Sequence, residues 1–174
     1  QVDACDPWAH PAVGWASCLM GPTYAATGEY QRALDINPNF AAGHGHLGLA
    51  LALDGESVSA IIHLDQALRM SPHDPQTFLF NVSLAIAHYL ADRYTDAVAF
   101  GRKAVQQRAS FSGGHRIFAA SLAQAGQSGE ARSAIDQLKK LQPDISIAWI
   151  EGNIPYMPDA MAKLVAGLRK AGLD

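Results

Sequence analysis

Three glycines in the first third of the chain match a pattern that can bind a phosphate. The segment GHGHLG, from Gly43 to Gly48, has the spacing G-x-G-x-x-G, in which backbone amides hold the pyrophosphate of a dinucleotide. Asp65 stands about where such a site needs an acidic residue for the ribose. The pattern requires a preceding strand, however, and the residues before Gly43 are the turn-forming segment NPNF. We therefore interpret the glycines as helix-packing positions and predict no dinucleotide or other cofactor.

Histidines could in principle bind a metal, and the chain has seven of them. His10, His44 and His115 recur at corresponding places of a repeat that is defined below. Packed helices lie about 10 Å apart, so these three side chains cannot meet at one ion. We expect packed imidazoles that bond to a backbone group or to water. Cys5 and Cys18 have no metal-ligand or redox spacing either, so we predict no metal site.

Two segments contain residue types that are used in hydrolysis. SPHD places Ser71, His73 and Asp74 together, but in a turn between predicted helices, with nothing to form an oxyanion hole. GQSGE around Ser128 lacks the glycines that a nucleophile elbow has two residues before and two after its serine. We predict no catalytic residue in this chain and do not expect it to be an enzyme.

The composition narrows the class of protein further. The chain has 174 residues, of which 49% are hydrophobic and 17% charged, with a net charge of −3. Thinly spread lysine and arginine exclude an electrostatic nucleic-acid surface, so we expect no nucleic-acid partner. No apolar run approaches the length of a membrane span, so this segment should make no membrane contact. The two isolated cysteines favour a cytoplasmic location. Abundant alanine without strand-like alternation favours an all-α fold.

A repeat of 34 residues explains the glycines. In the segment from Asn37 to Pro72, small residues and a proline occupy fixed places, namely Gly48, Gly55, Ala60, Ala67 and Pro72. Small residues at such places let two antiparallel helices approach closely, and the second glycine ends the first helix. The same places recur upstream at Gly14, Gly21, Ala26, Ala33 and Pro38, and downstream at Ala119, Gly126, Ala131, Leu138 and Pro143.

The intervening repeat fits only with three additional residues, which we place in its first helix. Asp92 then replaces the turn glycine, and Val82 replaces the small residue early in that helix. Asp74-Pro75 resembles the start of this helix, with the aspartate as N-cap. The chain is therefore predicted to be a single domain over 1–174. Its repeats cover approximately 7–40, 41–74, 75–111 and 112–145, residues 1–6 end a preceding truncated repeat, and 146–174 form a C-terminal helix and cap.

These spacings strongly resemble the tetratricopeptide repeat (TPR) family. The resemblance implies an all-α, right-handed α-α superhelix, a TPR solenoid, here with a C-terminal capping helix. The cap is the amphipathic segment DAMAKLVAGLRKAGLD, whose apolar stripe includes Leu164, Val165 and Leu168 and whose Lys163, Arg169 and Lys170 are free to face water.

The C-terminal tail suggests a parent protein. GLRKAGL after a PY turn resembles the C-terminal repeat regions of bacterial class III adenylate or guanylate cyclases that carry tetratricopeptide repeats. The chain would then be the regulatory or sensory part of a larger signalling protein. A repeat region from a glycosyltransferase or from a membrane-anchored transcriptional regulator is the alternative.

The family resemblance also implies how the chain acts. The first helix of each repeat lines a concave groove that binds a protein or peptide, and apolar groove residues suit a partner helix or a second copy in a homodimer. Trp15 would be the anchor, and Arg116 is the one cation among the groove positions. The alternative is that some of these side chains pack against the next helix. The predicted groove residues are Trp8, Trp15, Leu49, Leu53, Leu79, Ser83, Ile86, Arg116 and Gln124.

Overall fold

The computed structural model of the protein describes residues 23–174. Over this part of the chain it contains nine α-helices and no strand, which confirms the predicted all-α helical-repeat fold. Residues 1–22 lie outside this description. So do the predictions made for Cys5, Trp8, His10, Trp15 and Cys18.

The helices follow one another with short connections. In chain order they are α2 (Thr23–Ile36), α3 (Ala41–Asp54), α4 (Ser57–Met70), α5 (Thr77–Leu90), α6 (Tyr94–Gln107), α7 (Ser112–Gln124), α8 (Ser128–Leu141), α9 (Ile147–Asn153) and α10 (Pro158–Ala171). We call α3, α5 and α7 the A-helices, and α2, α4, α6 and α8 the B-helices. Each A-helix packs against the B-helices that precede and follow it in the chain.

Gly48 of α3 shows why small residues recur at fixed places. A Cβ atom built on Gly48 would lie 2.5 Å from Cγ of Leu64 and 3.1 Å from the carbonyl oxygen of Ala60 in α4. Any side chain here would push the two helices apart, because protein interiors are closely packed. Ala60 and Ala67 are fully buried, as their places in the repeat predict.

The other two glycines of the GHGHLG segment also lie inside α3. A Cβ atom on Gly45 would come within 2.1 Å of the Phe80 ring, and one on Gly43 within 2.7 Å of the Phe40 ring. Aromatic side chains fill the space that these glycines leave. The interpretation of the segment as helix packing, with no strand before it, is confirmed.

The turn inside each repeat needs a backbone conformation that favours glycine. Gly55 and Gly126 have φ angles of 86° and 79°, in the left-handed region. Asp92 takes the same place after α5 with a φ of 60°, which short polar side chains tolerate better than most. The prediction that Asp92 replaces the turn glycine is therefore confirmed.

The predicted place of the three additional residues is wrong. α5 has 14 residues, like α3 before it, so it is not one turn longer. Two of the three additional residues lie in the connection between α4 and α5, residues 71–76, which has six residues where the equivalent connections 37–40 and 108–111 have four. The third is at the start of α5, which begins 15 residues before its turn residue, whereas α3 and α7 begin 14 residues before theirs. Asp74 does not cap α5, because the helix starts at Thr77 with Gln76 as its N-cap. Counted back from Asp92, the small residue equivalent to Gly48 is Ala85 rather than Val82.

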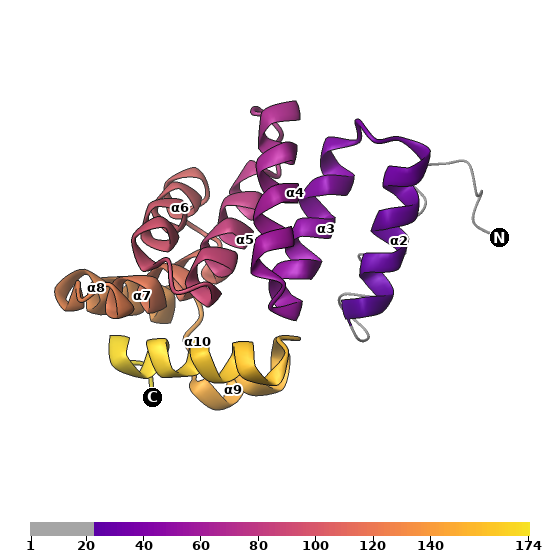
Figure 1. Ribbon diagram of the computed structural model, residues 1–174. Helices are drawn as coiled ribbons and strands as arrows, with labels where there is room; N and C mark the ends of the chain where they lie inside the picture. The colour runs from indigo at the N-terminus through magenta and orange to yellow at the C-terminus, as the bar shows by residue number, and fades with distance from the viewer. Residues whose placement is uncertain (1–22) are drawn as a thin grey trace.

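The packing of the A-helices gives the array its curvature. α3 packs directly on α5, and α5 on α7, whereas the described B-helices make no comparable contacts with one another. Because the A-helices lie closer together, the array bends with the A-helices on its inner side (Figure 1).

The two C-terminal helices, α9 and α10, do not form another repeat of paired helices. α9 has only seven residues and begins after Ser146, whose side chain accepts a hydrogen bond from the backbone nitrogen of Trp149. α10 buries the predicted stripe of Leu164, Val165 and Leu168. Its main packing partner is α7, and it makes less contact with α8 and α9. In Figure 1 it extends beneath the array from the α7 end towards α3.

Candidate functional site

The inner side of the A-helices is the candidate site. The turn residues with positive φ allow equivalent positions of the A-helices to be aligned, by counting back from each turn. Leu49, Ile86 and Ala120 each lie six residues before the turn residue of their repeat. Leu53, Leu90 and Gln124 each lie two residues before it. These equivalent places repeat from one A-helix to the next. We call the surface they form the inner face, consisting of Leu49, Leu53, Ile86, Leu90, Ala120 and Gln124.

Four predicted groove residues belong to the inner face. Leu49 and Gln124 are half-buried, whereas Leu53 and Ile86 retain only 8% and 5% of their accessible surface. Leu79 and Arg116 are half-buried and lie nearer the start of their helices.

Ser83 has a different place from the other predicted groove residues. Its side chain is fully buried, and its Oγ donates a hydrogen bond of 2.9 Å to the carbonyl oxygen of Leu79 in the same helix. The corrected register of α5 explains this, because Ser83 does not align with the rows that form the inner face.

The inner face is covered by the chain itself. A Cβ atom built on Gly167 of α10 would lie 3.1 Å from Cβ of Ala120 and 2.1 Å from Oη of Tyr89. At one end of α10 the backbone nitrogen of Met157 donates to the carbonyl oxygen of Leu53, at 3.3 Å. α10 and the residue before it thus contact all three A-helices.

Polar contacts hold α10 at the ends of the A-helices. Tyr89 Oη donates a 2.8 Å hydrogen bond to the carbonyl oxygen of Lys163. Lys163 Nζ donates to the carbonyl oxygen of Leu90 at 2.8 Å and lies 2.7 Å from Oδ1 of Asp92. Near the other end of α10, Lys170 Nζ lies 3.2 Å from Oε1 of Gln124. The prediction that Lys163 is free to face water is therefore wrong.

The Lys163 contact changes the acid–base properties of its neighbours. The hydrogen bond from Lys163, and then that from Tyr94, lower the pKa of Asp92 below its ordinary value. The hydrogen bond to Asp92 raises the pKa of Tyr94 to about 12. Tyr94 in turn packs edge-on against Tyr89, with ring centroids 5.6 Å apart. One lysine of α10 therefore organises the polar groups at the α5–α6 turn.

Arg116 lies beside the connection between α9 and α10. Burial lowers its pKa, and the nearby Tyr156 hydroxyl opposes that shift. Burial raises the pKa of Tyr156 to about 12. No carboxylate of residues 23–174 forms an ion pair with Arg116.

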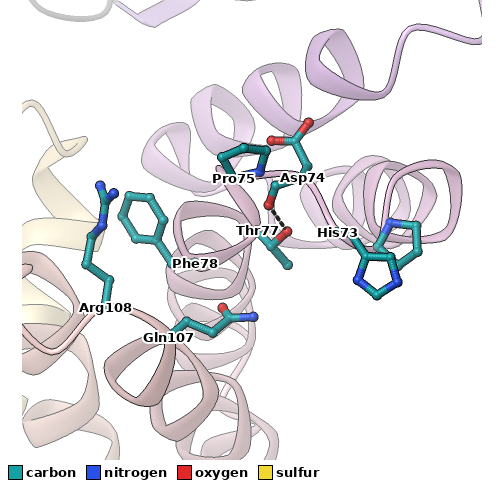
Figure 2. Close-up of a pocket in the computed structure, with 8 residues that line it drawn as sticks. His73, Asp74, Pro75, Thr77, Phe78, Gln107 and Arg108 are labelled. Carbon is teal, nitrogen blue, oxygen red and sulfur yellow. Dashed lines mark hydrogen bonds between the residues drawn. The ribbon is translucent and has the colours of Figure 1, made fainter.

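The longer α4–α5 connection forms a pocket of about 310 Å³ (Figure 2). The guanidinium of Arg108 stacks over the Phe78 ring at 4.1 Å, and Phe78 meets Phe111 edge-on at 5.4 Å. Thr77 Oγ1 donates to the carbonyl oxygen of Asp74, which closes the connection against the start of α5. Sequence reasoning missed this pocket because it placed the additional residues inside α5. The proline pair in PHDP was the available signal for a longer connection.

His44 and His115 pack as the sequence predicts. The carbonyl oxygens of Pro38 and Ala109 accept hydrogen bonds from Nε2 of His44 and His115, at 3.1 Å and 2.9 Å. The corrected register places Asn81, not Phe78, at the equivalent position of the third repeat. Within residues 23–174 no three metal-binding side chains are grouped so that they could hold an ion. None of the helices in this part of the chain is both long and apolar enough to span a bilayer.

Comparison with known proteins agrees with this architecture. A family model described as Tetratricopeptide repeat matches residues 25–75 and 63–112, which together cover slightly more than half of the chain. No curated protein sequence is significantly similar to the chain.

Three solved structures have folds similar to this chain at low sequence identity. PilW, a type IV pilus biogenesis factor, has a TM-score of 0.73 at 18% identity, over 97% of this chain and 74% of that one. MamA of strain AMB-1 has a TM-score of 0.64 at 22% identity, over 83% and 84%. YrrB, a TPR protein described as having an unusual peptide-binding site, has a TM-score of 0.63 at 16% identity, over 97% and 86%. Identities this low establish likeness of fold alone.

Proposed function

Because this chain belongs to the tetratricopeptide repeat family, we propose that it is a protein-interaction module that binds a protein or peptide on its inner side. The observation that carries the proposal is the packing of α10 against the inner side of the A-helices. On this side the A-helices hold one amphipathic helix, α10, which contacts Ala120 at Gly167 and makes polar contacts with Leu53, Leu90 and Gln124. The peptide-binding site described for YrrB, on the same fold, supports peptide or protein as the class of ligand.

Residues beyond the inner face extend the proposed surface. Leu79 and Arg116 lie towards the start of α5 and α7 and retain exposed area. Leu49 on α3 is half-buried. We place the external contacts of a partner on Leu49, Leu79 and Arg116, and we leave the buried Ser83 out of the surface. Trp8 and Trp15 stay predicted contacts outside the described residues.

Site-specific photo-crosslinking in the organism of origin tests this proposal. A photoreactive phenylalanine analogue replaces Leu49 or Leu79 on the inner side, and Gln106 or Arg132 on exposed B-helix positions serves as the matched control. We expect one protein to be captured from both inner positions and from neither outer one. Equal capture from inner and outer positions would contradict a partner-binding inner side.

A second copy is the alternative occupant of the surface. Self-association would place Leu49 and Leu79 of two chains together and would appear as a dimer in light scattering. Replacing Leu49 by aspartate would then return the mass to that of a monomer. A monomer at all accessible concentrations would leave a different protein as the partner.

We infer that the array is the regulatory part of a longer signalling protein of the adenylate or guanylate cyclase kind, located in the cytoplasm. The support is the likeness of the tail, from Pro155-Tyr156 to Leu173, to such proteins, together with the cysteine usage. Glycosyltransferase and transcriptional-regulator parents are the alternatives. The full reading frame decides between them, because a cyclase domain upstream would be recognisable by its metal-binding aspartates.

A further inference from the structure

α10 lies across the inner side of the array in the way that a bound helix would. Its contacts run from the end of α3, through Met157 and Leu53, to the end of α7, through Lys170 and Gln124. It packs mainly on α7, and it and the residue before it reach the ends of α5 and α3 rather than continuing the stack of repeats (Figure 1). A segment placed like this occupies the surface that an external helix would need.

The fit between α10 and the inner face depends on the absence of a side chain at one place. Gly167 is buried, and any Cβ atom there would overlap Oη of Tyr89 and press on Ala120. Tyr89 is fully buried and has little freedom to move aside. The inner face therefore distinguishes a helix with glycine at this position from one with a larger residue.

A lysine one turn before the glycine adds a polar requirement. Lys163 Nζ reaches both the carbonyl oxygen of Leu90 at the end of α5 and the carboxylate of Asp92. A cation at the C-terminal end of a helix is favoured by the partial negative charge there. The spacing K-x-x-x-G, with Leu164 and Leu168 on the buried stripe, is the pattern that this surface accepts.

Residues 154–157 link α9 to α10 without helical structure, and Pro155 and Pro158 stand within and after this link. The stripe that α10 buries combines the small residues Ala160, Gly167 and Ala171 with Leu164, Val165 and Leu168, which supply most of its buried apolar area.

We propose that the inner face is a helix-binding groove, that its external ligand is an amphipathic helix of another protein with the pattern K-L-x-x-G-L, and that α10 is the intramolecular competitor of that ligand. The proposal rests on the interaction function argued above and names the class of partner. Because a tethered segment has an effective concentration of about 1 mM, a matching external helix would bind the resting chain only weakly.

The test uses the full chain and a fluorescent peptide of residues 155–174 as the probe. Gly167→Leu in the chain should expel α10 and free the groove, whereas Ala166→Leu, at an exposed neighbouring position, is the matched control. We expect the Gly167→Leu chain to bind the peptide at least tenfold more tightly than the wild-type and Ala166→Leu chains. A peptide that itself carries Gly167→Leu should not bind any of them.

Three results would overturn the proposal. They are equal binding by all chains, no binding by a Gly167→Leu chain that keeps its remaining helices, and dimers of the Gly167→Leu chain at concentrations where the wild type is a monomer. The last would make a second copy the occupant. These outcomes test only whether the partner is a helix of this pattern. The crosslinks from Leu49 and Leu79 test separately whether any partner binds the inner side.

A second design does not depend on the folding of the Gly167→Leu chain. A protease site introduced after Asn153 in the otherwise wild-type chain separates α10 without altering its buried stripe. We expect the severed α10 to stay bound and then to exchange for excess labelled peptide, while a Gly167→Leu peptide fails to exchange. Failure of the wild-type peptide to exchange would also overturn the proposal.

Discussion

The hydroxyl of Tyr89, at the end of α5, donates a hydrogen bond to the carbonyl oxygen of Lys163, 74 residues further along the chain in α10. This bond joins the repeat array to its C-terminal helix at a fully buried place. The side chain of Lys163 makes a second link between the two parts, because its Nζ contacts the carbonyl oxygen of Leu90 and the carboxylate of Asp92, both close to Tyr89 in the sequence. The two residues thus determine where α10 lies on the array.

Tyr89→Phe should loosen α10 without disturbing the repeats. Loss of the buried hydrogen bond should lower the free energy of unfolding by about 0.5–1.5 kcal/mol. Hydrogen exchange should accelerate in α10 and stay unchanged in α3. Tyr94→Phe, which loses a bond to the exposed Asp92, is the control and should have a smaller effect. Faster exchange in α3 and α10 alike would contradict a local role for Tyr89.

Ala67→Leu should destabilise the packing of the second repeat. Ala67 is fully buried, so the added carbon atoms overpack the core and should lower the free energy of unfolding by about 1–3 kcal/mol. Urea denaturation measures the change. Ala99→Leu, at an exposed position of α6, should leave stability within about 0.5 kcal/mol of the wild type. An unchanged midpoint for Ala67→Leu would argue against the alignment of the repeat.

Acidification should weaken the Lys163–Asp92 contact. The pKa of Asp92 is depressed in the folded chain below its ordinary value of 3.8, chiefly by the hydrogen bond from Lys163. The stabilising contribution is therefore present above the ordinary pKa and is lost as the pH falls through the depressed one. Nuclear magnetic resonance titration should show the pKa of Asp92 rising towards its ordinary value in Lys163→Met. An identical titration in both chains would show that the contact is absent in solution.

The buried histidines should make the fold less stable as the pH falls below about 6.5. His44 Nε2 donates to Pro38, so in the neutral pair its Nδ1 accepts from Nδ1 of His63, 2.9 Å away. Burial, and then the charge of His44, lower the pKa of His63 below 6.5. Burial also lowers the pKa values of His46 and His88.

The unfolded chain therefore binds more protons than the folded one in this pH range, and stability should rise with pH. Thermal unfolding between pH 5 and 8, at about one-unit steps around the histidine pKa, measures the slope. His63→Gln should make the slope shallower, whereas the exposed His73→Gln should leave it unchanged. Equal slopes for both variants would remove His63 as a source of the pH dependence.

Local chemistry in the sequence was sufficient to predict the helical repeat. Gly48, Ala60 and Ala67 could be assigned to helix contacts because only small residues permit that approach, whatever surrounds the pair. The turn at Gly55 followed from its conformational freedom, and the recurrence of the spacing located Asp92 as its equivalent. The same reasoning placed Leu49, Leu53, Ile86 and Gln124 on the first helices of their repeats.

The tertiary structure decided the rest, because length and periodicity alone do not say where a chain absorbs additional residues or where a free amphipathic helix docks. Three added residues satisfy the repeat whether they lengthen a helix or a connection, and in the folded chain two of them lie in the α4–α5 connection and one at the start of α5. The apolar stripe of α10 could be predicted from the sequence, but the place where this helix packs on the array could not. That position depends on the space left at Gly167 beside Tyr89 and Ala120, which exists only once α5 and α7 are side by side.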